Sequence, residues 1–207
     1  MVEKTKGDSP RISRRSLLKG LSGGVLTTGL ISVAELPGQR TNVRSEDGAE
    51  IYGPGPVPLT LNINGREHKA ELEPRVTLLN ALRNHLDLTG SKLVCDRGTC
   101  GGCTVLLDGM PITSCMMLAI DAVGKEIQTI EGLAQGDALH PVQRAFIEHD
   151  ALQCGFCTSG MIMSAKALLD RNPNPTLDEV KAAVSGNLCR CGTYPKVFEA
   201  VLAAAKK

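Results

Sequence analysis

Eight cysteines, in two groups of four, are the residues of this chain best suited to chemistry. The first group has the spacing C-x4-C-x2-C and gains a fourth member after eleven more residues: Cys95, Cys100, Cys103 and Cys115. Three thiolates on one short loop and a fourth on a later segment are typical of a plant-type [2Fe–2S] cluster. This group, the first cysteine set, therefore predicts one such cluster.

Three glycines within the same loop favour this interpretation. A loop that wraps a cluster must bend at residues with positive φ and bring its backbone close to the inorganic sulfides, and Gly98, Gly101 and Gly102 permit both. We expect their N–H groups to point at sulfur and to tune the reduction potential.

The second cysteine set has a C-x2-C pair, a gap of 31 residues and a C-x-C pair: Cys154, Cys157, Cys189 and Cys191. The last two lie too close in sequence for the usual zinc knuckle, and neither pair contains a histidine. We expect a second [2Fe–2S] cluster between two helix N-termini, whose partial positive charge stabilises thiolates.

Other uses of these cysteines have to be weighed. An even number of cysteines in an exported protein commonly forms disulfides, and zinc remains an alternative ligand. A thioredoxin-like site would need a single C-x2-C pair, whereas this chain has two, each beside further cysteines. Each half of the chain is small, and the whole chain has three Phe, two Tyr and no Trp. Such small hydrophobic cores need additional stabilisation, which bound clusters would supply.

Residues 1–34 are predicted to be a twin-arginine signal peptide. Basic residues precede Arg14 and Arg15, an apolar run diluted by small residues follows, and Ser32-Val33-Ala34 suits a signal peptidase. Because the run is too polar for a comfortable spanning helix, we expect cleavage and no stable membrane insertion. Export of an already folded protein to the periplasm would let the thiolates bind iron in the reducing cytoplasm first.

The remaining chain carries no sign of nucleic-acid binding. Residues 1–34 hold six of the 23 basic and two of the 22 acidic residues, which leaves the rest with a net charge near −3. No basic patch with interleaved aromatic residues follows, so nucleic acid is excluded as a partner. Residues 35–58, rich in Gly, Pro and charge, are predicted to be a linker.

Residues 59–132 are predicted to form a plant-type ferredoxin domain. Alternating residues on either side of Asn64-Gly65 predict a hairpin, and Thr77 is expected to cap a helix that ends near Thr89-Gly90. Strands are expected at 104–107, from Ile112 to Cys115, and at 126–130. Strands, one helix and strands again predict a small mixed sheet of the β-grasp type.

Residues 133–207 change to helical periodicity. We expect four helices: one from Pro141, one over 159–169, one after a capping box of Thr176 and Glu179, and one from Pro195. The chain is thus predicted to be α+β, with a β-grasp domain followed by an all-α four-helix [2Fe–2S] domain.

The two motifs together resemble the iron–sulfur subunit of the xanthine oxidase family of molybdenum hydroxylases. The family patterns C-x4-C-G-A-C-T, Q-C-G-x-C-T and G-N-x-C-R-C stand here at 95–104, 153–158 and 186–191. Val94 and Gly102 depart from the family's usual glycine and alanine. The segment Thr158-Ser159-Gly160 and the twin-arginine signal look like the branch of periplasmic aldehyde oxidoreductases.

This resemblance implies an electron-transfer role within an oxidoreductase complex. A large partner subunit would hold the molybdopterin cofactor and hydroxylate an aldehyde or N-heterocycle with oxygen from water. Electrons would pass through the two clusters to a FAD subunit or a haem-bearing cytochrome c. Gln153 matches the family glutamine that hydrogen-bonds the pterin, which places the C-terminal cluster nearer the molybdenum. No catalytic residue is expected in this chain.

Two other functions are alternatives. One is a free-standing exported ferredoxin, and the other is a non-redox binding module stapled by metal or disulfides. A carrier of the first kind needs neither a helical domain nor Gln153. Arg190 is expected to contact a cluster sulfur, a partner or a surface carboxylate. The scattered histidines are expected at the surface or at helix ends and make no Rieske pairing: His68, His85, His140 and His149.

Overall fold

The computed structural model describes residues 43–44 and 50–205, which belong to one compact unit. The predicted signal peptide and most of the predicted linker lie outside the described residues and stay predictions. Two short antiparallel strands, β1 (Val43–Arg44) and β2 (Glu50–Ile51), precede the main fold. No helix among the described residues is both long enough and apolar enough to cross a bilayer.

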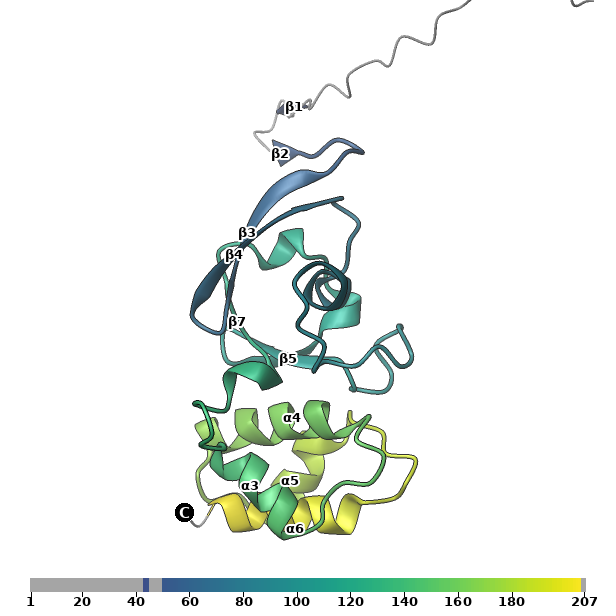
Figure 1. Ribbon diagram of the computed structural model, residues 1–207. Helices are drawn as coiled ribbons and strands as arrows, with labels where there is room; N and C mark the ends of the chain where they lie inside the picture. Colours follow the sequence, from purple (N-terminus) through teal and green to yellow (C-terminus); the bar gives the residue numbers. More distant parts are fainter. Residues whose placement is uncertain (1–42, 45–49, 206–207) are drawn as a thin grey trace, which may run out of the picture. The chain divides into compact units, whose positions relative to one another are not determined.

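A five-stranded mixed sheet forms the first half of the fold, in the order β4-β3-β7-β5-β6 (Figure 1). Its strands are β3 (Val57–Ile63), β4 (Arg66–Leu72), β5 (Thr104–Leu107), β6 (Met110–Thr113) and β7 (Glu126–Gln128). Strands β3 and β7 are parallel, and the other neighbours are antiparallel. The hairpin of β3 and β4 turns at Asn64-Gly65, as the sequence predicts.

One short helical segment covers a face of this sheet. It begins as α2 (Leu78–Asn80) and continues as a π-helical turn, η1 (Ala81–His85). Thr77 caps it as expected, because its hydroxyl accepts a hydrogen bond from the Asn80 N–H. Leu78 and Leu82 are fully buried against the sheet, in a core with Leu61 and Ile127. The sheet and this helix confirm the β-grasp-like prediction.

The predicted strands of this half end earlier than expected. Strand β6 stops at Thr113, and Cys115 lies in a 3₁₀ turn, η2 (Ser114–Met116). The Ser114 hydroxyl donates to the Cys103 carbonyl at 2.7 Å, which ties this turn to the cysteine loop. Further 3₁₀ turns are η3 (Ile120–Ala122) and η4 (Ile130–Gly132), and the latter replaces the end of the strand expected at 126–130.

Four helices form the second half, as the sequence predicts. They are α3 (Pro141–Glu148), α4 (Thr158–Arg171), α5 (Leu177–Val184) and α6 (Tyr194–Ala205). Thr176 and Glu179 make the expected capping box at α5. At α3, the cap is His140, whose Nδ1 accepts from the Val142 N–H at 3.3 Å. Side-chain caps, together with a proline at the first position of α3, therefore define where α3 and α5 begin.

Strand β5 joins the two halves because it is buried on both faces. Val105 and Leu107 point into the core of the sheet and α2, whereas Leu106 belongs to the core of the four helices. This alternation follows from the two-residue repeat of a strand. Helix α4 lies along β5 (Figure 1) and brings the segment after Cys157 beside the first cysteine loop.

Candidate metal centres

The first cysteine set combines two buried and two partly exposed thiols. Cys103 and Cys115 are 2 % and 5 % exposed and share a small apolar core with Leu79. Cys95 and Cys100 lie on the outer part of the loop and keep part of their surface. The bond from Ser114 to the Cys103 carbonyl is what brings the distant Cys115 into this site.

Backbone geometry in this loop agrees with the expected role of its glycines at two positions. Gly98 and Gly101 have φ of +72° and +68°, the left-handed region that favours glycine. The Gly98 N–H donates to the Cys115 Sγ at 3.3 Å, which is the predicted bond to sulfur. Gly102 instead provides space, since a Cβ there would lie 3.2 Å from the Val94 Cγ2.

The thiols of the first set differ strongly in acidity. The Thr99 hydroxyl, followed by the Arg97 N–H and the Cys100 thiol, lowers the pKa of Cys95 to about 6. Burial, followed by the neighbouring Cys103 thiol, raises the pKa of Cys115 to about 11. A cation would remove this difference, because both sulfurs would then be held as thiolates.

The second cysteine set lies where α4 and α6 begin. Cys157 is the N-cap residue of α4, and Cys189 and Cys191 lie on the loop before α6. Cys154 and Cys191 are exposed, whereas Cys157 and Cys189 are half-buried against the helical core. The predicted position between two helix N-termini is thus what the fold provides.

Two thiols of this set also differ in pKa. Burial and the adjacent Cys189 raise the pKa of Cys157 to about 12. Burial acts on Cys189 as well, but hydrogen bonds outweigh it, chiefly from the Thr193 hydroxyl at 3.2 Å and the Thr193 N–H, so its pKa falls to about 7. Tyr194 supports this loop: its hydroxyl accepts from the Cys189 N–H at 2.8 Å.

The thiols within each set influence one another's pKa. Cys103 and Cys95 act on Cys115 in the first set, and Cys189 and Cys154 act on Cys157 in the second. All eight cysteines are free, so the structure does not support the disulfide alternative. Within the described residues, no three His, Cys, Asp or Glu side chains group closely enough to hold a metal ion. Four cysteines in each set match the four thiolate ligands of a [2Fe–2S] cluster.

Gln153 and Arg190, singled out from the sequence, both lie exposed beside the second cysteine set. Gln153 directly precedes the exposed Cys154, a position from which it can reach a partner. Arg190 forms no ion pair with any other residue that the structure describes.

Sequence reasoning missed Asn187, which is 2 % exposed and hydrogen-bonded to both halves of the fold. Its signal was present in the segment Gly186-Asn187-Leu188-Cys189-Arg190-Cys191. Asn187 stands two residues before Cys189 in this segment, but the segment alone does not predict its hydrogen bonds to the first cysteine loop.

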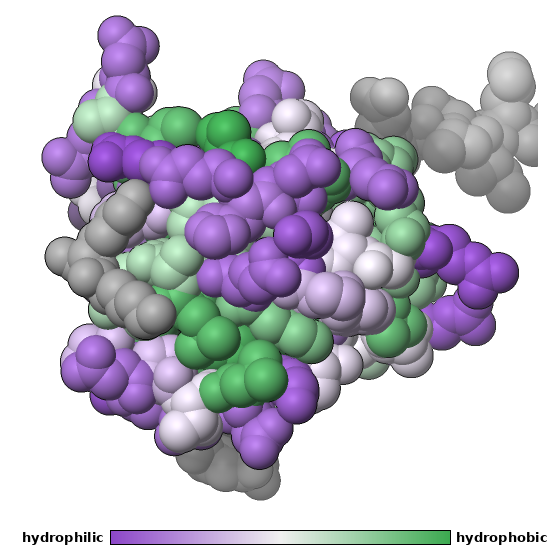
Figure 2. Space-filling model, turned by 90° about the horizontal axis from the view of Figure 1, so that it is seen from below, coloured by the Kyte–Doolittle hydropathy of each residue, from purple (hydrophilic) through white to green (hydrophobic). Residues whose placement is uncertain are grey.

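Large apolar side chains around the two cysteine sets are unusually exposed. Leu93, Val94, Phe156 and Leu188 are each between 53 % and 59 % exposed. Away from the cysteines, the face carrying α3 and α6 shows apolar residues in small groups between hydrophilic ones (Figure 2). Exposed apolar residues that gather at a site are typical of an interaction surface.

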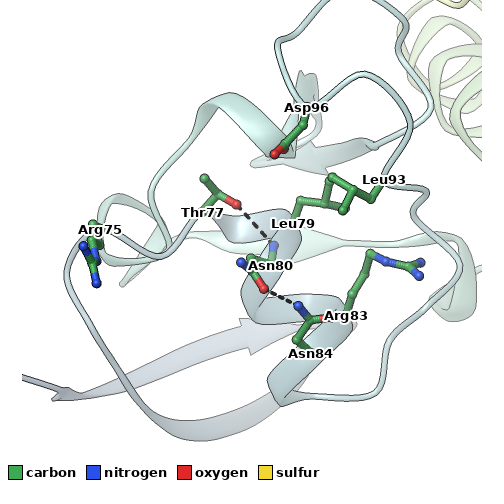
Figure 3. Close-up of a pocket in the computed structure, with 8 residues that line it drawn as sticks. All are labelled: Arg75, Thr77, Leu79, Asn80, Arg83, Asn84, Leu93 and Asp96. Carbon is green, nitrogen blue, oxygen red and sulfur yellow. Dashed lines mark hydrogen bonds between the residues drawn. The ribbon is translucent and has the colours of Figure 1, made fainter.

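A small pocket of about 130 Å³ lies beside the first cysteine loop, lined in part by Asp96 and Leu93 (Figure 3). Other polar residues that line it are engaged in hydrogen bonds with the protein. Asn80 donates its N–H to Thr77 and accepts from Asn84, and the Arg83 guanidinium donates to the Thr89 and Ser91 carbonyls. These bonds fix the loop before Cys95, which gives the pocket a structural role.

Comparison with protein families matches both halves. Residues 61–131 match the model of the 2Fe-2S iron-sulfur cluster binding domain, and residues 129–202 match that of the [2Fe-2S] binding domain. The two models together cover the described fold from β3 into α6.

Curated relatives and solved structures agree with these matches. The nicotine 6-hydroxylase small subunit of Paenarthrobacter nicotinovorans is 51 % identical over 72 % of this chain and 89 % of its own. The aldehyde oxidoreductase iron-sulfur-binding subunit PaoA of Escherichia coli K12 is 39 % identical over 94 % of this chain and 88 % of its own. The quinoline 2-oxidoreductase structure from Pseudomonas putida 86 has a TM-score of 0.71 and 45 % identity, covering 73 % of this chain and 95 % of that chain.

Proposed function

Because this chain belongs to the small iron–sulfur subunits of the molybdenum hydroxylases, we propose that each of its cysteine sets holds one [2Fe–2S] cluster. The observation that carries the proposal is the presence of eight free cysteines in two sets of four, one in each half of the fold. The chain is then a subunit of an oxidoreductase complex that transfers electrons and transforms no substrate itself.

The clusters would supply one-electron chemistry, and the protein would supply their surroundings. Burial of Cys103 and Cys115 keeps water from one side of the first site, and the Gly98 N–H donates to the Cys115 sulfur. At the second site, the Thr193 hydroxyl bonds the Cys189 sulfur and Tyr194 holds the Cys189 N–H. Hydrogen bonds and solvent exposure of this kind set cluster potentials.

A large subunit with a molybdopterin cofactor is the proposed electron donor. Gln153 and Cys154 are both exposed, which supports contact between the second site and that cofactor. Exposed Phe156 and Leu188 support a protein interface at the same place. We infer that a FAD subunit or a cytochrome c accepts the electrons.

The proposed substrate of the complex is an aldehyde or an N-heterocycle. Similar subunits come from an aldehyde oxidoreductase, with 39 % identity over 94 % of this chain, and from a nicotine 6-hydroxylase, with 51 % identity over 72 %. We further propose that residues 1–34 direct the folded protein to the periplasm by the twin-arginine pathway.

Cysteine variants of the full complex test the relay. Two clusters give about four iron atoms per chain, and reduction should reveal two distinct electron paramagnetic resonance (EPR) signals. Cys154→Ser should abolish substrate-driven reduction of the acceptor, whereas Cys95→Ser should stop electrons later and leave the second cluster reducible by substrate. Wild-type turnover in both variants would contradict the relay. Purification of the chain without any large subunit would favour the free-standing ferredoxin.

A further inference from the structure

One buried amide joins three segments of the chain. The Asn187 Nδ2 donates to the Gly101 carbonyl at 2.9 Å and to the Thr104 Oγ1 at 3.3 Å, and the Asn187 Oδ1 accepts from the Ser164 hydroxyl at 2.8 Å. Both amide hydrogens and the amide oxygen are therefore used, which fixes one orientation of the side chain. The segments so joined are the loop of the first cysteine set, helix α4 and the loop of the second cysteine set.

The backbones of the two cysteine loops also touch. The Leu188 N–H donates to the Cys100 carbonyl at 2.9 Å. Cys100 belongs to the first set, and Leu188 is bonded directly to Cys189 of the second. A single hydrogen bond thus connects the backbone of one predicted ligand to the residue beside another.

Two glycines make this approach possible. A Cβ on Gly160 of α4 would lie 2.1 Å from the Gly101 carbonyl oxygen. A Cβ on Gly101 would lie 2.5 Å from both the Asn187 Nδ2 and the Gly186 carbonyl oxygen. The two loops are packed as closely as backbone atoms allow, and the Asn187 amide fills the space between them.

We propose that Asn187 is a positioning residue that fixes the separation of the two clusters and thereby their electronic coupling. This inference rests on the proposed function, since it requires a cluster on each set. In the step concerned, one electron leaves the reduced cluster and enters the oxidised one, and no bond forms or breaks. Electronic coupling declines more steeply across a gap than through bonds, so keeping the Cys100–Leu188 bond closed favours transfer.

The test is the magnetic interaction between the two reduced clusters in the full-length, iron-loaded chain. When both clusters are paramagnetic, their spin–spin splitting at low temperature depends steeply on their separation. Asn187→Ala removes both bonds to the first loop and should weaken or abolish this splitting. The same substitution at the exposed Asn174, in the turn between α4 and α5, is the matched control and should leave the splitting at the wild-type value.

A milder variant covers the case in which Asn187→Ala does not load iron. Ser164→Ala removes only the bond to the Asn187 oxygen, so we expect full iron content with a reduced splitting and slower equilibration between the clusters. An unchanged splitting in every iron-loaded variant, at Asn187 or at Ser164, overturns the positioning role. Wild-type protein without two cluster signals instead refutes the proposed function, so the two failures are distinguishable.

Discussion

The two cysteine sets use opposite ways of protecting a metal site. In the first set, Cys103 and Cys115 are buried in the sheet half, and a glycine-rich loop closes over them. In the second set, Cys154 and Cys191 are exposed at the ends of helices. The first site is built to be shielded by its own chain, whereas the second depends on something outside the described residues to exclude water.

This difference also gives the two sites different positions in a relay. An exposed site beside Gln153 is suited to receive electrons from a partner, and a buried one is suited to store and pass them. Cys95 is partly exposed and keeps that site from being fully enclosed. The first site can therefore face a second partner at its outer edge.

Loss of one ligand in each set should give the largest effects. Cys115→Ser and Cys191→Ser should each halve the iron content, because each removes one of four thiolates from a cluster. Cys115→Ser should also lower the melting temperature more, since it puts a hydroxyl into the core beside Leu79. Iron analysis would measure the iron content of each variant, and calorimetry would measure the melting temperatures. Equal melting temperatures for the two variants would contradict the difference in burial.

Thiol reactivity in the iron-free chain should be the next largest effect. At pH 7, Cys95 with a pKa of about 6 is mostly thiolate, whereas Cys115 with a pKa of about 11 is almost entirely thiol. We expect alkylation at Cys95 to be about 30- to 100-fold faster, allowing for the weaker nucleophilicity of the more acidic thiol. Raising the pH should bring the two alkylation rates closer together, because a larger fraction of Cys115 is then thiolate. Mass spectrometry of partly alkylated protein measures both rates, and equal rates would refute the assigned acidities.

Features that depend on a few neighbouring residues could be predicted from the sequence. Local signals predicted the Asn64-Gly65 hairpin, the Thr77 cap and the Thr176–Glu179 capping box, because each depends on a few neighbouring residues. Cysteine spacing likewise predicted the two sets, and the backbone placed Cys157 at a helix N-terminus.

Features that depend on distant residues were missed. The turn that carries Cys115 is tied to the Cys103 carbonyl by the Ser114 hydroxyl, and no local pattern reveals that bond. Asn187 and Gly101 are 86 positions apart in the sequence, so their contact appears only after folding. The same holds for Gly102, whose role is close packing against Val94 and which needs no positive φ.

Close packing between the two halves can be tested with a pair of glycines. Gly160→Ala should destabilise the protein by about 1–3 kcal/mol, because its Cβ would overlap the Gly101 carbonyl and outweigh the better helix propensity of alanine. Gly186→Ala makes the same chemical change where no protein atom lies within 4 Å, and we expect a change within about 0.5 kcal/mol. Urea unfolding compares them, and a neutral Gly160→Ala would refute the tight contact.

Two helix caps, one in each half, should give the smallest effect and differ only in pH dependence. Burial, aided by Lys166, lowers the pKa of His140 below 6.5, and its neutral Nδ1 accepts the Val142 N–H. A depressed histidine pKa means that the unfolded chain binds more protons, so the stabilisation is fully present above pH 6.5 and is lost as the pH falls below 6.5 and through the lower pKa of the folded state. His140→Asn keeps a capping oxygen, so it should change stability at neutral pH by no more than about 1 kcal/mol and should remove this part of the pH dependence. Thr77→Asn changes a cap that does not titrate, so the slope of stability between pH 7 and pH 5 should stay unchanged. An equal change of this slope in both variants would show that His140 is not the titrating group.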